Sequence, residues 1–117
     1  MDKTFLTGRY QYEFEDGDTC EMSLTFAILK LLASKNKAQY EAYNEAMRSI
    51  SSGKGTEMDN MTILYTAYCC ANMNGDAPLM GENEFLEKCG SDREAVSNAL
   101  SFLTNPKKKK ASANLSD

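Results

Sequence analysis

The sequence predicts a mainly α-helical fold with a small N-terminal β-hairpin, an α+β protein of about five helices. Two patterns support this prediction. Residues 9–24 alternate apolar and polar side chains, which is the period of a half-buried strand. From residue 25 onward, apolar residues recur three and four positions apart, as in an amphipathic helix. The length of 117 residues fits one compact domain, which we place at residues 1–105, followed by a flexible basic tail at residues 106–117.

The predicted hairpin has strands at about residues 9–15 and 19–24. Asp16-Gly17 between them is typical of a two-residue turn, because both residue types tolerate positive φ. One face of the two strands is apolar and consists of Tyr10, Tyr12, Phe14, Cys20, Met22 and Leu24. A lone hairpin is marginally stable in water, so we expect this face to dock on another apolar element or on another chain.

Two helices are predicted directly after the hairpin. Thr25 can cap the first, and Asn36 with Gln39 resembles a capping box for the second, at about residues 37–50. The second helix has an apolar stripe that consists of Tyr40, Tyr43, Met47 and Ile50. Residues 51–56 are typical of a flexible linker. Their "SGKGT" is not a phosphate-binding loop, because it lacks the upstream glycine of that motif.

A long apolar helix is predicted at about residues 57–73. Thr56 with Asp59 can cap it, and Gly75 can end it in the left-handed conformation. Its residues 63–73, "ILYTAYCCANM", carry no charge and are apolar on almost every side. Such a helix must be surrounded, either by its own domain or by other subunits.

The last two helices are expected at residues 82–89 and at about residues 92–104. Gly90 stops the first of them, and Ser91 with Glu94 forms another capping-box pattern for the second. The apolar face of the last helix consists of Val96, Ala99, Leu100 and Leu103.

Chemical sites are not indicated by the residue types. The chain has no histidine, which excludes histidine bases, Ser-His-Asp triads and histidine-containing zinc sites. Asp16, Asp18 and Glu21 lack the spacing of a helix-loop-helix calcium site. Cys69 and Cys70 are neighbours on a helix and point about 100° apart, so they cannot bind one metal as a CxxC motif does. We therefore expect no enzymatic activity, no catalytic residue, no metal site and no cofactor, and cysteines that pack as small apolar side chains.

The net charge of −4 is unevenly distributed. Residues 106–117 hold four lysines and one aspartate, a charge of +3, so residues 1–105 carry −7. An acidic body repels phosphate groups, which argues against a nucleic-acid-binding domain. The sequence has no signal-peptide pattern and no apolar segment long enough to span a membrane, so we expect a cytosolic protein with reduced thiols.

The tyrosines and methionines allow two interpretations. Tyr65 and Tyr68 lie three positions apart on one helix face, and Tyr40 and Tyr43 repeat this spacing on another helix. Seven methionines add apolar surface of the adaptable kind found at binding sites for variable partners. These residues are either ordinary core or a partner-binding surface, and the spacing alone leaves both open.

Four segments resemble, in order, the small tail assembly chaperones of long-tailed phages that infect Gram-positive bacteria, those of lactococcal siphophages in particular. The segments are "YEFEDGDTCEMSLTFAILKLLASKNKAQYEAYNEAM", "MDNMTILYTAYCCANM", "NEFLEKCGSDREAVSNAL" and "FLTNPKKKK". The resemblance covers nearly all of residues 9–110. It implies a late protein of the host cell cytoplasm that is absent from the mature virion, self-associates, and keeps the helical tape measure protein soluble during tail assembly.

The resemblance also implies a longer form made by ribosomal frameshifting, which contacts the tail tube protein. We expect the shift at the codons of Lys107–Lys110, because runs of lysine codons are rich in adenine. The alternative to a chaperone is a structural minor tail protein that is retained in the virion.

We predict that several copies, in a homo-oligomer larger than a dimer, form an apolar trough for tape measure helices. The predicted trough residues are Phe26, Tyr40, Tyr43, Met47, Tyr65 and Tyr68.

Overall fold

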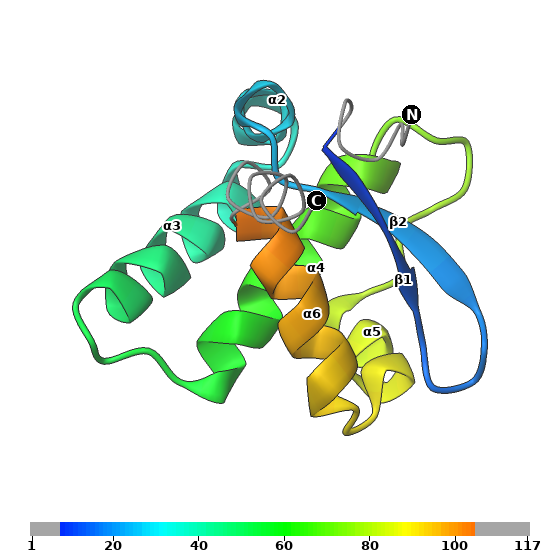
Figure 1. Cartoon of the computed structure of the whole chain (residues 1–117). Helices are drawn as coiled ribbons and strands as arrows, with labels where there is room; N and C mark the ends of the chain where they lie inside the picture. Colours follow the sequence, from blue (N-terminus) through cyan, green and yellow to red (C-terminus); the bar gives the residue numbers. More distant parts are fainter. Residues whose placement is uncertain (1–7, 105–117) are drawn as a thin grey trace, which may run out of the picture.

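The computed structural model describes residues 8–104 and has the predicted α+β architecture, a two-stranded antiparallel hairpin followed by five helices (Figure 1). The elements are β1 (Arg9–Glu13), β2 (Thr19–Ser23), α2 (Phe26–Lys35), α3 (Lys37–Ser51), α4 (Glu57–Asn72), α5 (Glu82–Cys89) and α6 (Arg93–Thr104). The predicted basic tail and frameshift site lie outside the described residues.

The connection between β1 and β2 is one residue longer than the predicted two-residue turn. Gly17 N donates to Phe14 O at 3.0 Å, and Phe14 N donates to Asp18 O at 2.8 Å. The loop therefore comprises three residues, Glu15, Asp16 and Gly17, and Gly17 has a φ of +93°. This is the arrangement in which a tight turn is followed by one left-handed residue, a position that glycine adopts without steric cost.

The hairpin docks on the helices of its own chain, which confirms one of the two options expected for its apolar face. β2 lies along α4 and β1 lies along α6 (Figure 1). Tyr12 and Met22 are buried in this contact, and the ring of Tyr10 packs against Phe102 with centroids 5.4 Å apart.

Side-chain caps start α2 and α3 as predicted. Thr25 Oγ1 accepts a hydrogen bond from Ile28 N at 3.3 Å, and Asn36 Oδ1 accepts one from Gln39 N at 3.2 Å. The second cap is not a reciprocal capping box, because Gln39 Nε2 donates instead to Thr66 Oγ1 on α4. This bond ties α3 to the central helix.

The start of α4 is the predicted capping box, but its end differs from the prediction. Asp59 N donates to Thr56 Oγ1 at 3.3 Å, and Thr56 N donates to the Asp59 carboxylate at 2.9 Å. The helix ends at Asn72, and Gly75 does not adopt a positive φ. A hydrogen bond from Gly75 N to Asn72 O closes the last turn, so no left-handed residue is needed there.

The boundary between α5 and α6 agrees with the prediction in one respect and differs in another. Gly90 ends α5 with a φ of +62°. The cap of α6 is Asp92, whose Oδ1 accepts from Ala95 N at 3.1 Å, and not Ser91. Ser91 N instead donates to a Glu15 carboxylate oxygen in the hairpin loop.

The core is built around α4. All eight residues from Ile63 to Cys70 are buried, which explains why this segment has no polar face. The hairpin and the other four helices all contact α4, which runs through the centre of the molecule in Figure 1. The helix is therefore surrounded by its own domain, the first of the two options that its sequence allowed.

Candidate functional site

Two of the six predicted trough residues, Tyr65 and Tyr68, lie in the core and form no part of the surface of this chain. Their exposed fractions are 9% and 6%, and their rings stack at 5.9 Å between centroids. Both rings also contact Phe85 of α5, at 5.2 and 5.4 Å. In the folded chain these two rings face α5 and not solvent, because Phe85 packs on both of them.

Backbone groups of the loop before α5 hold the two tyrosine hydroxyls. Tyr65 Oη donates to Met80 O at 2.9 Å, and Met80 N donates to Tyr68 Oη at 2.9 Å. Burial raises the pKa of the Tyr65 hydroxyl, so it stays protonated and remains a donor. The two rings thus anchor the loop on α4.

Tyr40, Tyr43 and Met47 are half-buried on the side of α3 that packs against the core. Burial raises the pKa of Tyr43, and smaller contributions come from Cys70 on α4 and from Tyr40. The rings are therefore part of the contact between α3 and α4, with only their outer parts reaching solvent.

Phe26 is 92% exposed at the first position of α2. It remains a surface apolar residue, but α2 presents no second exposed large apolar side chain. The six predicted residues therefore do not form one continuous surface within one chain.

A groove lined by both apolar and polar residues, which the prediction did not include, lies between the first turn of α4, the C-terminal end of α5 and one side of α6. Its volume is about 700 Å³. Met61, Leu86, Val96 and Leu100 are half-buried along it, and Met58, which is 58% exposed, stands at its edge. These side chains belong to α4, α5 and α6, so the groove exists only once the three helices have packed together.

The wall formed by α6 follows helical periodicity along the whole helix. The α6 residues that line the groove are Arg93, Val96, Ser97, Leu100, Ser101 and Thr104. From the first to the last of these, a helix rises about 16 Å. The groove is therefore about three helical turns long, with an apolar floor and small polar residues on the α6 side.

One part of the groove could be predicted from the sequence, namely the apolar side chains of the last helix that line it. Val96 and Leu100 were predicted on the apolar face of the last helix, and the structure leaves them half-buried, whereas Ala99 and Leu103 of the same face are buried. The predictions from the sequence do not include the exposure of Met58, because they assign no exposed face to the first turn of α4.

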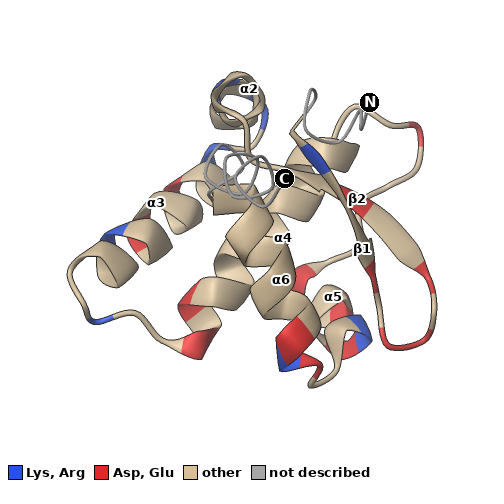
Figure 2. Cartoon of the chain, in the orientation of Figure 1, with Lys and Arg blue, Asp and Glu red and all other residues tan. Residues whose placement is uncertain are grey.

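Charge is segregated on the molecule. Residues 24–54, which contain α2 and α3, hold five basic and two acidic residues, a charge of +3. The other described residues hold three basic and thirteen acidic residues, a charge of −10. Figure 2 shows the acidic residues on the hairpin and around the start of α4, α5 and α6. The groove lies on this acidic side.

An ion pair closes one end of the groove. The Arg93 guanidinium binds both carboxylate oxygens of Glu57, which joins the first residue of α6 to the first residue of α4. The bond to Arg93 lowers the pKa of Glu57. The pair is exposed, so it fixes the relative position of two helix ends more than it adds stability.

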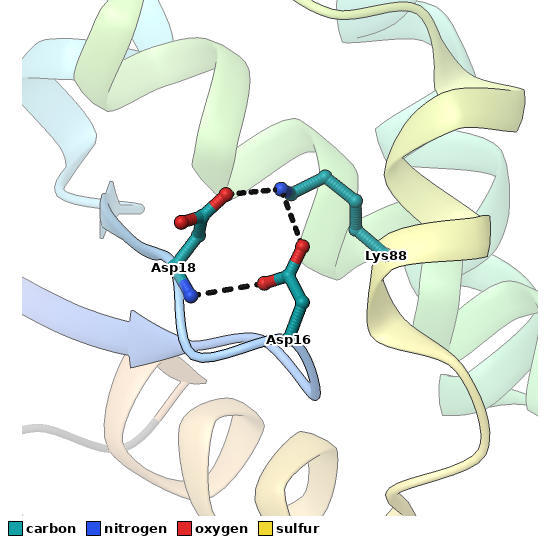
Figure 3. Close-up of polar contacts among 3 residues, drawn as sticks. All are labelled: Asp16, Asp18 and Lys88. Carbon is teal, nitrogen blue, oxygen red and sulfur yellow. Dashed lines mark hydrogen bonds and ion pairs between the residues drawn. The ribbon is translucent and has the colours of Figure 1, made fainter.

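A second ionic cluster joins α5 to the hairpin loop (Figure 3). Lys88 Nζ donates to Asp16 at 2.9 Å and to Asp18 at 2.6 Å, and it lies 5.1 Å from the centre of the Phe14 ring. Two of the three carboxylates considered as calcium ligands thus have an ammonium group between them, and the third, Glu21, pairs with Arg9. Within residues 8–104, no group of three histidine, cysteine, aspartate or glutamate side chains could hold a metal ion.

The four cysteines are free thiols, and all but the half-buried Cys20 are buried. Burial raises the pKa of Cys69 to about 11 and that of Cys70 to about 12. Both are therefore neutral thiols near pH 7, which agrees with the expectation that they pack as apolar side chains.

Comparison with protein-family models, with curated proteins and with solved structures finds no match to this chain. In the part of the chain that the structure describes, no helix is long and apolar enough to cross a membrane.

Proposed function

We propose that this protein is a tail assembly chaperone that binds apolar helical segments of the tape measure protein in the host cell cytoplasm and keeps them soluble. The groove between α4, α5 and α6 is the observation that carries the proposal. It replaces the trough of tyrosines as the binding site on each copy.

The shape of the groove favours a helix as its occupant. A helix bound in a groove inserts side chains from positions i, i+3, i+4 and i+7 of one face. A floor of half-buried apolar residues about three turns long matches such a face. Met58 and Met61 have flexible side chains, so the groove can adapt to different apolar sequences along a long partner.

The size of the groove favours a segment over a globular partner. Fifteen described residues line it, whereas a standard interface between two proteins uses about 20–30 residues on each side. One such site binds weakly, and repeated sites on several copies gain affinity along one tape measure chain.

Co-expression with the tape measure protein of the same phage tests this proposal. We expect the tape measure protein to be soluble with the native chain and to aggregate without it. A Ser101→Arg substitution places a long charged side chain in the groove at an exposed position, so it should abolish solubilisation while the protein stays folded.

Asn98→Arg is the matched control. Asn98 is exposed on the same helix but does not line the groove, so this variant gains the same charge and should solubilise the partner normally. Equal solubilisation by both folded variants would exclude the groove. A tape measure protein that aggregates even with the native chain would exclude the function.

A further inference from the structure

The hairpin loop is fastened to the corner where α5 ends and α6 begins. Glu15 N donates to Lys88 O at 3.4 Å, and the Glu15 carboxylate accepts a hydrogen bond from Ser91 N at 3.1 Å. Lys88 Nζ also binds Asp16 and Asp18 of the same loop (Figure 3). The loop therefore holds the backbone both at the end of α5 and directly after it.

Gly90 lies between the two backbone groups that Glu15 binds. Its φ of +62° is in the region that favours glycine. A Cβ atom at this position would also overlap the Glu15 carboxylate. A side chain here would thus strain the backbone and displace Glu15, so the close approach of the hairpin loop is a second reason for glycine at this position.

The corner that Glu15 holds is part of the groove. Cys89, Gly90, Ser91 and Asp92 all line the groove, whereas Glu15 does not. α5 has eight residues, and a helix of that length is not stable by itself, so its tertiary contacts decide where its C-terminal end lies. One of those contacts comes from a loop outside the groove.

We infer that Glu15 is a positioning residue for the groove: it acts through Gly90 and Ser91 and sets how tightly the groove binds a helix. The inference rests on the proposed function and adds a residue that does not itself line the binding site. A groove whose corner is already in place loses less conformational freedom when a helix enters it, so it binds more tightly. The coupling is reciprocal, so an occupied groove should hold the hairpin loop more firmly than an empty one.

Binding of one synthetic peptide tests the inference. The peptide has about eighteen residues, a leucine and phenylalanine stripe, and flanking positions shared equally between lysine and glutamate. In Glu15→Ala, we expect the dissociation constant to rise about fivefold, the low end of the usual range for coupling between sites, because the contact is exposed. In Glu15→Gln the amide oxygen can still accept from Ser91 N, so most of the native affinity should return. Both variants lose the same charge, so charge alone does not distinguish them.

Glu13→Ala is the matched control. Glu13 is an exposed residue at the end of β1 that does not line the groove, and it carries the same charge as Glu15. This variant should bind the peptide as the native protein does. All variants are compared where circular dichroism shows them folded, so that a loss of stability is not taken for a loss of affinity.

Hydrogen exchange gives a readout that a purely stabilising role would not change. In the native protein, the peptide should slow the exchange of the amides of residues 14–18 in the hairpin loop, which do not line the groove. In Glu15→Ala at saturating peptide, this protection of the loop should be lost.

The outcomes separate the inference from the proposed function. Native affinity in a folded Glu15→Ala, an equal loss in Glu13→Ala, or equal binding by Glu15→Gln and Glu15→Ala overturns the role of Glu15 and leaves the groove as a binding site. Loop protection that persists in Glu15→Ala overturns that role as well. A native protein that does not bind the peptide, or a Ser101→Arg variant that binds it as well as Asn98→Arg does, overturns the groove and the inference together.

Discussion

Lys88 illustrates how one side chain can hold two distant parts of a chain together. Its ammonium group binds Asp16 and Asp18 of the hairpin loop and also lies over the Phe14 ring. The hydrogen bond from Lys88 keeps the pKa of Asp16 below its usual range. The cluster therefore depends on an ionised carboxylate, which makes its contribution to stability dependent on pH.

We predict that the effect of Lys88→Met on stability depends on pH. A carboxyl group whose pKa is lowered by folding stabilises the folded state above its unfolded pKa, about 3.9, and this contribution is lost as the pH falls through the folded value. Lys88→Met should lower the free energy of unfolding at about pH 6, and the difference from the native protein should shrink as the pH falls below about 4. Urea unfolding at several pH values measures it, and a difference that stays constant would contradict the role of Asp16.

Replacing both thiols of the central helix should affect packing alone. Cys69→Ala with Cys70→Ala removes two buried sulfur atoms, so we expect a loss of about 1–2 kcal/mol in the free energy of unfolding. Solubilisation of the tape measure protein should be unchanged at a temperature where the variant is folded. Stoichiometric zinc in the pure native protein, or a folded variant that no longer solubilises its partner, would contradict a purely packing role.

At the scale of elements, the N-terminal cap of α4 stabilises the end of the helix that also forms one wall of the groove. Thr56→Ala should lower the free energy of unfolding by about 1 kcal/mol, whereas Thr56→Ser keeps the hydroxyl and should cost less. Thermal unfolding followed by circular dichroism compares the two. An equal loss in both variants would indicate that the hydroxyl does not stabilise the helix.

A helix or strand could be predicted from the sequence where the residues that start or stop it lie close together in the chain. The caps at Thr25 and Thr56 and the stop at Gly90 involve residues within four positions of each other, so short segments reveal them. The predicted cap at Ser91 failed because Ser91 N donates to Glu15, seventy-six positions away. A contact over such a distance leaves no local pattern.

The candidate site was predicted less well for the same reason. Tyr65 and Tyr68 have the spacing of an exposed stripe, but Phe85 covers them, and nothing within α4 indicates which helix packs on that face. The groove arises where α4, α5 and α6 meet and fail to fill the space between them. The positions of three helices decide this, so periodicity within one helix cannot reveal it.

At the scale of the whole molecule, one argument for an oligomer does not hold. The hairpin and α4 are covered within the chain, so they need no second copy to bury their apolar faces. Phe26, Ile50 and Met58 are the large apolar side chains that stay exposed in the described residues. They are too few to require association for folding.

We still predict homo-oligomers larger than a dimer, because a row of weak sites is the arrangement that gains affinity on a long partner. The basic side of one copy, at α2 and α3, can face the acidic side of the next, so association should weaken as salt is raised. Light scattering at micromolar concentration and two salt concentrations measures this. A strict monomer at low salt would contradict it.

The packing of α6 against β1 has a consequence for synthesis on the ribosome. β1 precedes the other described elements in the chain and α6 follows them, so these two elements meet only after residue 104 has been added. Until then the nascent hairpin lacks one of its two supporting helices, and the groove lacks its longest wall. A product whose reading frame changes beyond residue 104 keeps all of the described residues and therefore all of the residues that line the groove.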